Sequence, residues 1–157
     1  MKCLILCLLA TLLVQRVCDA DVTKLPAEHK KALQDVSRFR EVHAVTNLPP
    51  AVVALCADHN GRIAEPGQKW QVSDVITDDT LPRKRLIWAA TNGDSYVVHY
   101  ESGGIAHGFH VLVVRLKRGD DKPSFMWHGV GRQLKDFRSF LDAVESNKLD
   151  DTLEYVH

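Results

Sequence analysis

The sequence predicts an α+β fold, in which N-terminal helices precede an antiparallel β-meander of about five strands and a C-terminal helix packs on the sheet. Three observations lead to this prediction. Apolar residues recur at helical spacing near both ends of the chain. The middle of the chain carries short apolar runs separated by Gly, Asn and Asp, which are typical of tight turns. A sheet with helices before and after it buries their apolar faces in one domain.

The first twenty residues have the layout of a secretory signal peptide. Lys2 supplies a positive start, and residues 3–14 form an apolar run that is too short to span a bilayer. Cys18 and Ala20 place small side chains just before a cleavage site. We therefore expect cleavage after Ala20 and export of residues 21–157 as one soluble domain, to the periplasm or the extracellular space.

The composition limits the partners of this domain. Over the whole chain, 20 basic residues balance 20 acidic residues, and no long run of one charge occurs. Near neutrality argues against a partner that is held by bulk charge, such as nucleic acid or an anionic membrane surface. The length suits a single domain with one core, and the partner is expected to be a protein or a small ligand.

Three of the four cysteines lie in the predicted signal peptide, so Cys56 remains alone after cleavage and no intramolecular disulfide can form. A lipidated Cys7 or Cys18 is an alternative, but Arg16 just before Cys18 suits lipoprotein processing poorly. Cys56 follows an apolar segment and is interpreted as a small core side chain. The alternative makes it a nucleophile beside the base His59.

Two helices are predicted before the sheet. Pro26 opens the first, which covers residues 27–43, because proline is tolerated at the first helical position. Its apolar face recurs at three-residue steps, at Leu33, Val36, Phe39 and Val42. The second helix covers residues 51–58, between the break at residues 47–50 and the turn at residues 60–61.

Five strands are predicted in the middle of the chain, at residues 69–76, 83–91, 95–101, 105–117 and 124–130. Asn92-Gly93 is the strongest hairpin signal, because both residues accept positive φ. Ser102-Gly103-Gly104 predicts a second tight turn. The run from 105 to 117 is strongly apolar and predicts a central strand.

The last predicted helix covers residues 132–147. Its apolar stripe consists of Leu134, Phe137, Leu141 and Val144. The sheet is the large apolar surface on which this stripe is expected to pack. In the tail, Leu149, Leu153 and Tyr155 are expected either to dock on the core or to fray.

Candidate ligand-binding or metal-binding residues surround the turn at residues 102–104. They are His99, Glu101 and His107, with His128 on the neighbouring strand. Imidazole and carboxylate groups are good ligands for zinc or another divalent metal. The alternative interpretation is structural, because the spacing matches no established metal motif and histidine is common on half-buried strands. We expect no cofactor, with a divalent metal as the alternative.

The length of this hairpin loop decides whether those residues converge. A three-residue loop pairs Glu101 with Ile105 and His99 with His107, and it points His110 to the other face beside Tyr96. This register also groups apolar side chains on one plausible core face, namely Tyr96, Val98, Tyr100, Leu112, Val114 and Leu116. A loop of two or four residues would slip the register and dissolve the cluster.

Two further features have competing interpretations. The basic run at residues 83–85 and the cations Arg115, Lys117 and Arg118 would form an anion-binding patch if their strands lay close together. Otherwise these charges protect strand ends against edge-to-edge pairing. The three tryptophans, Trp70, Trp88 and Trp127, either line a ligand groove or fill the core between sheet and helix.

These observations favour a non-enzymatic, exported binding or interaction protein, because the sequence contains no strong catalytic motif. The competing hypothesis is a small metal-dependent or hydrolytic enzyme that uses His99, Glu101 and His107. A third hypothesis is a structural subunit of an envelope assembly. Metal content and native mass would distinguish the three.

Overall fold

A computed structural model describes residues 24–76, 78–146 and 148–151. The predicted signal peptide and the tail residues Leu153 and Tyr155 therefore lie outside the described residues. Within the described part, no helix is long and apolar enough to cross a bilayer.

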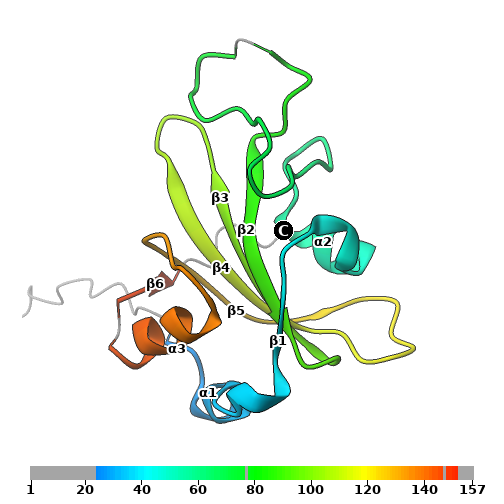
Figure 1. The fold of residues 1–157 in the computed structure, drawn as a ribbon, viewed down its shortest axis with the longest axis vertical. Coiled ribbons are helices and arrows are strands. Elements are labelled where there is room, and N and C mark those ends of the chain that lie inside the picture. The colour runs from blue at the N-terminus through cyan, green and yellow to red at the C-terminus, as the bar shows by residue number, and fades with distance from the viewer. Residues whose placement is uncertain (1–23, 77, 147, 152–157) are drawn as a thin grey trace, which may run out of the picture.

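A single antiparallel sheet forms the centre of the molecule (Figure 1). Its six strands follow one another in chain order, so that the sheet is a meander. They are β1 (Arg40–Val42), β2 (Lys84–Thr91), β3 (Ser95–Ser102), β4 (Gly108–Arg115), β5 (Ser124–Gly131) and β6 (Asp150–Asp151). The long strands β2 to β5 confirm the last four predicted strands, and the predicted α+β class is confirmed.

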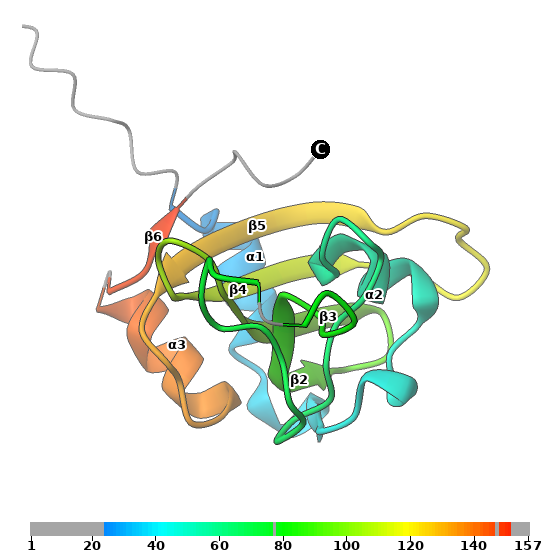
Figure 2. The same ribbon diagram turned by 90° about the horizontal axis from the view of Figure 1, so that it is seen from above.

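The helices cover both faces of this sheet. They are α1 (Ala27–Leu33), α2 (Pro50–Cys56) and α3 (Phe137–Glu145). Figure 2 shows α1 and α3 on one side of the sheet and α2 on the other. We call the first side the α1/α3 face and the second side the α2 face.

Each face has its own apolar core. On the α1/α3 face, Trp88, Val97 and Val111 pack with Phe137 and Phe140. On the α2 face, the core consists of ten buried residues, Val42, Leu48, Val52, Cys56, Leu86, Ala89, Val98, Tyr100, Leu112 and Val114. The grouping of apolar side chains on two faces therefore follows the alternation expected of strands.

The first predicted helix is too long. The α-helix ends at Leu33, a 3₁₀ turn follows at Val36–Arg38, and β1 takes up Arg40–Val42. Asp35 accepts a hydrogen bond from the Ser37 hydroxyl at 2.6 Å, a local bond that competes with helix formation. Pairing with β2 then satisfies backbone hydrogen-bonding groups of β1, a short extended segment that helical periodicity cannot reveal.

The predicted strand at residues 69–76 is also wrong, because this segment forms a loop (Figure 1). Its apolar residues Val72, Val75 and Ile76 are exposed, so the alternating pattern does not match a buried sheet face. Only an isolated bridge joins Ser73 to Gly104 within the described residues. β1 occupies the edge that the prediction gave to this segment.

The C-terminal helix starts later than predicted and is held by a cap. Asp136 accepts a hydrogen bond from the Ser139 backbone N–H at 2.8 Å, which satisfies a donor of the first turn. The predicted stripe does pack on the sheet, since Leu134, Phe137 and Leu141 are buried. Leu149 is buried as well, and β6, which follows it, pairs with β5 and forms the edge of the sheet.

Candidate functional site

The β3–β4 hairpin has a five-residue loop, from Gly103 to His107, and not the predicted three-residue turn. Glu101 therefore pairs with Phe109, and His99 pairs with Val111. The register differs from the predicted one by four positions, an even number, so every side chain remains on its predicted face.

Contacts with a neighbouring loop explain the wider turn. The Gly103 N–H donates to the Arg83 carbonyl at 2.9 Å, and the Gly104 N–H donates to the Val72 carbonyl at 3.0 Å. A Cβ atom on Gly103 would lie only 2.1 Å from the Gln71 carbonyl oxygen. Glycine at this position therefore allows the hairpin loop to pack directly against the backbone of the loop that precedes β2.

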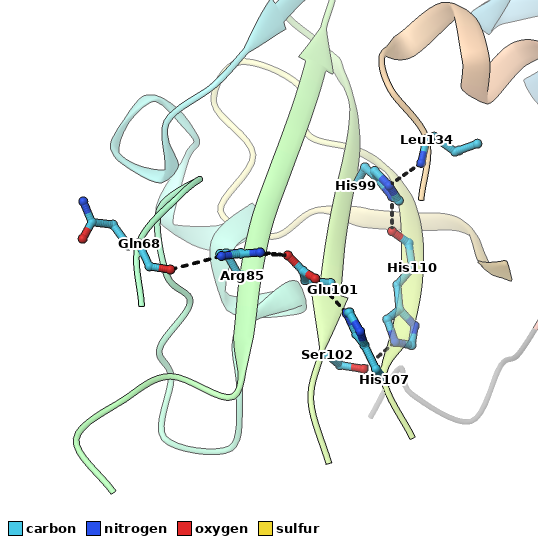
Figure 3. A network of polar contacts seen from close by, with 8 residues as sticks. All are labelled: Gln68, Arg85, His99, Glu101, Ser102, His107, His110 and Leu134. Carbon is cyan, nitrogen blue, oxygen red and sulfur yellow. Dashed lines mark hydrogen bonds and ion pairs between the residues drawn. The ribbon is translucent and has the colours of Figure 1, made fainter. Parts of the chain in front are cut away.

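Glu101 and His107 meet on the α1/α3 face, together with Arg85 (Figure 3). The Glu101 carboxylate receives Arg85 on Oε1 and His107 on Oε2, each at 2.7 Å. The Arg85 guanidinium also lies over the Trp70 ring, 5.2 Å from its centroid. We call Arg85, Glu101 and His107 the Glu101 cluster. Its carboxylate is buried and already neutralised by a cation.

His99 shares this face but does not join the Glu101 cluster. Its Nδ1 contacts the His110 carbonyl oxygen at 2.9 Å, and its Nε2 accepts the Leu134 N–H at 3.0 Å (Figure 3). The second bond requires an unprotonated Nε2, so Nδ1 carries the hydrogen. Burial lowers the pKa of His99 to about 4, which agrees with a neutral ring. Both ring nitrogens are thus occupied by backbone groups.

His128 lies on the α2 face, with Tyr100 and His110. The Tyr100 hydroxyl lies 3.2 Å from His128 Nε2, and the ring of His110 stacks on both of these rings, with centroids 4.9 Å from Tyr100 and 5.4 Å from His128. Of the four candidate residues, the structure therefore brings together only Glu101 and His107. Among the described residues, no group of three His, Cys, Asp or Glu side chains is placed to hold a metal ion.

A cavity of about 360 Å³ opens on the α2 face beside this stack. It is lined by Asp58, His59, Arg83, Lys84, Tyr100, Ser102, Gly103, Gly104, Ile105, Ala106 and His110. We call it the Ser102 cavity. The Ser102 hydroxyl lies 2.7 Å from His110 Nε2 and ties the ring to the wall (Figure 3). Burial is the main reason that the pKa of His110 falls to about 4, and the neighbouring His128 lowers it further.

In the Ser102 cavity the carboxylate has hydrogen-bond partners, whereas the two cations form no ion pair among the described residues. The Asp58 carboxylate accepts the backbone N–H groups of Asn60, Arg62 and Arg83 at 2.9 to 3.0 Å. These bonds lower its pKa despite the opposing effect of desolvation, so it is satisfied as an anion. Lys84 lies 5.2 Å from the centroid of the Tyr100 ring, and burial lowers its pKa. Within the described residues, neither Lys84 nor Arg83 forms an ion pair.

Cys56 is buried at the end of α2, as predicted. Its thiol donates to backbone carbonyls of the same helix, and burial raises its pKa to about 12. Such a thiol is a poor nucleophile, because the thiolate is the reactive form. His59 lines the Ser102 cavity instead.

The two groups of basic residues, which would form an anion-binding patch only if they lay close together, are at opposite ends of the sheet. Lys84 pairs with Ser102 at one end of β3, whereas Arg115 pairs with Ser95 at the other end. At about 3.3 Å per residue, the length of β3 separates the two groups. Trp88 and Trp127 fill the core of the α1/α3 face, and Trp70 instead packs against Arg85 and His107.

Sequence reasoning missed most residues of the Ser102 cavity, including Lys84 as its cation and Ser102 as the partner of His110. The alternation of strand residues does place Tyr100 and His110 on one face, and this was the available signal. The loop before β2, which completes the surroundings of the hairpin, leaves no comparable pattern in the sequence.

Comparison with protein-family models, with curated proteins and with solved structures finds no match to this chain.

Proposed function

We propose that this chain is a non-enzymatic, exported binding protein whose ligand is a small molecule held in the Ser102 cavity. The observation that carries the proposal is the cavity itself, which has the size of a typical ligand pocket. Its wall combines two stacked rings, Tyr100 and His110, with a hydroxyl and two cations. Polar groups at fixed positions orient a ligand in its site, and this wall offers several of them beside its rings and small residues.

The His110 ring of the wall is held in place before any ligand arrives. His110 is held by Ser102 and by ring contacts with Tyr100 and His128. A preorganised wall favours binding, because little side-chain entropy remains to be lost. Export rests on the predicted signal peptide, and N-terminal sequencing of the secreted protein should begin at Asp21.

The Ser102–His110 pair supports binding better than catalysis. A serine beside a histidine is the arrangement of an activated nucleophile. However, a general base works best when its pKa is close to the working pH, and that of His110 is lowered to about 4. The ring therefore shares a hydrogen bond with Ser102 but is a weak base for removing its proton.

Hydrolytic or metal-dependent chemistry at the Glu101 cluster is the second candidate function. The observation in its favour is the 2.7 Å contact between Glu101 and the partly exposed His107, which orients an imidazole. The Arg85 ion pair opposes it by neutralising the carboxylate. Elemental analysis of the mature protein, together with His107→Gln tested for any hydrolytic activity, separates this candidate from the binding protein.

A small-molecule screen by NMR tests the proposed function. We expect hits whose chemical-shift changes centre on Tyr100, Ser102 and His110. The variant Ala106→Trp narrows the cavity and should abolish these hits, whereas the control Ala32→Trp adds the same bulk to exposed α1 on the other face. A screen without hits, or hits that survive Ala106→Trp, would contradict the proposal.

A further inference from the structure

The cations of the Ser102 cavity point to the chemistry of its ligand. Lys84 is partly desolvated, yet no carboxylate lies within ion-pair distance of it among the described residues. Arg83 adds a second positive charge, and the nearby Asp58 carboxylate is satisfied by backbone donors. A bound anion would restore the solvation that Lys84 loses on burial.

An apolar surface adjoins the mouth of the same cavity. Every large apolar side chain that is exposed in the described part of the chain belongs to two loops, at Val72, Val75, Ile76 and Ile105. Ile105 lines the cavity and is 96% exposed. The hydrogen bond from Gly104 to Val72 and the bridge to Ser73 join the two loops, which lie side by side in Figure 1. We call these four residues the apolar rim.

We infer that the ligand is a small amphipathic anion, with a carboxylate or phosphate head at Lys84 and Arg83 and a short apolar chain across Ile105 toward the apolar rim. The inference rests on the proposed function and specifies its ligand class. Charge complementarity places the anionic head of the ligand inside the cavity, because Lys84 and Arg83 line it. The position of Ile105, both lining the cavity and exposed at its mouth, places the chain.

The apolar chain of the proposed ligand would cover the apolar rim, whose exposure to water is otherwise unfavourable. Exposed apolar side chains that gather in one region mark interaction or ligand-binding sites, whereas single ones are normal. A second copy of the protein could also cover the rim, but it would leave the two cations inside the cavity without a partner. The amphipathic anion satisfies both features at once.

Isothermal titration of the mature protein with octanoate and octyl phosphate tests the inference. Acetate tests the head alone, and octyltrimethylammonium carries the same chain with the opposite charge. We expect octanoate to bind more tightly than acetate, by up to about fourfold for each methylene that reaches the rim. The cationic probe should not bind. Comparison of octanoate with octyl phosphate assigns the head as a carboxylate or a phosphate.

Matched variants connect each part of the ligand to its residues. Lys84→Gln should weaken octanoate binding by about tenfold. Arg115→Gln removes the same charge at the far end of the sheet and should leave it unchanged. Ile105→Ser should remove the advantage of octanoate over acetate. Thermal melts of each variant verify that it remains folded.

The possible failures are distinguishable. If neutral or cationic molecules bind at Tyr100 and Ser102 while octanoate and octyl phosphate do not, the ligand class is wrong and the binding function stands. If no molecule binds there, the proposed function fails as well. Concentration-dependent dimerisation that is lost in Ile105→Ser would assign the rim to a second copy and overturn the inference.

Discussion

The two faces of the sheet each bury a histidine whose pKa is lowered to about 4, but the two rings have different hydrogen-bond partners. His99, on the α1/α3 face, bonds two backbone groups from separate segments. His110, on the α2 face, bonds the half-buried Ser102 hydroxyl and forms part of a cavity wall. Burial and a shifted pKa therefore do not by themselves identify a functional residue, whereas the partners of the ring do.

On the α1/α3 face, His99 belongs to a clamp around one peptide segment. The His99 ring accepts the Leu134 N–H, and the Trp88 indole N–H donates to the Leu134 carbonyl at 2.8 Å. The rings of Trp88 and His99 are themselves in contact, 5.3 Å apart. This clamp fixes the chain just before α3. Around Leu134 the α1/α3 face is thus closed by packing and backbone bonds, whereas the α2 face opens into the Ser102 cavity beside His110.

The largest expected effect tests whether the α1/α3 face is closed by packing. The Phe137 side chain is buried and stacks on Phe39, with ring centroids 4.6 Å apart. Phe137→Ala should lower the free energy of unfolding by about 3–5 kcal/mol, measured by urea denaturation. The neighbouring exposed residue provides the control Arg138→Ala, which should change little. A Phe137→Ala variant that melts within a degree or two of the parent would show that α3 does not close this face.

The next effect is acid destabilisation, to which both faces contribute. The unfolded chain protonates these imidazoles below about pH 6.5, whereas folded His99 and His110 remain neutral down to about pH 4. Their stabilising contribution is complete above pH 6.5 and is lost as the pH falls toward 4, by up to about 3 kcal/mol for each ring. Urea denaturation across this range measures the loss. A stability that stays constant from pH 6.5 to pH 4 would contradict the neutral, buried rings.

The strands and their faces were predictable because their signals are local. Turn residues bound β2 to β5, and the alternation of apolar residues assigns Val98 and Leu112 to one face and Val97 and Val111 to the other. The short edge strand β1 was not predictable, because its pairing with β2 overrides a helical periodicity. The loop before β2 was predicted as a strand because it contains several apolar residues, but Val72, Val75 and Ile76 are exposed and cover no sheet face.

The candidate site was predictable only in part, for a geometric reason. Alternation places Glu101 and His107 on the same face, but it does not reveal that the backbone around Leu134 occupies His99. The loop length depends on contacts between Gly103 and the segment at Gln71 and Val72, far earlier in the chain, which no local pattern encodes. Residues of the Ser102 cavity come from the loop after α2, the start of β2 and the β3–β4 hairpin, and only tertiary structure brings them together.

A smaller effect separates the two histidines directly. His99→Leu leaves the Leu134 N–H and the His110 carbonyl without their partner and should cost about 2 kcal/mol of stability. It should also remove the His99 share of the acid destabilisation. Binding in the Ser102 cavity should persist in His99→Leu and should be lost in the matched variant His110→Leu. The opposite pattern of binding would reverse the assignment of the two faces.

The smallest change in stability should come with a large change in binding, at Ser102. Its hydroxyl bonds His110 Nε2 at the edge of the cavity, where water can replace it because Ser102 is only half-buried. Ser102→Ala should therefore cost about 1 kcal/mol or less. The His110 ring, however, loses the bond that fixes its orientation in the wall. Part of the binding free energy must then be spent on ordering the ring, so the ligand binds more weakly.

Ser139→Ala offers a control on the other face, since Ser139 also bonds a neighbouring side chain, Asp136, through its hydroxyl. Titration and melting of both variants decide the matter: a large loss of stability in Ser102→Ala with unchanged binding would make the α2 face as structural as the α1/α3 face.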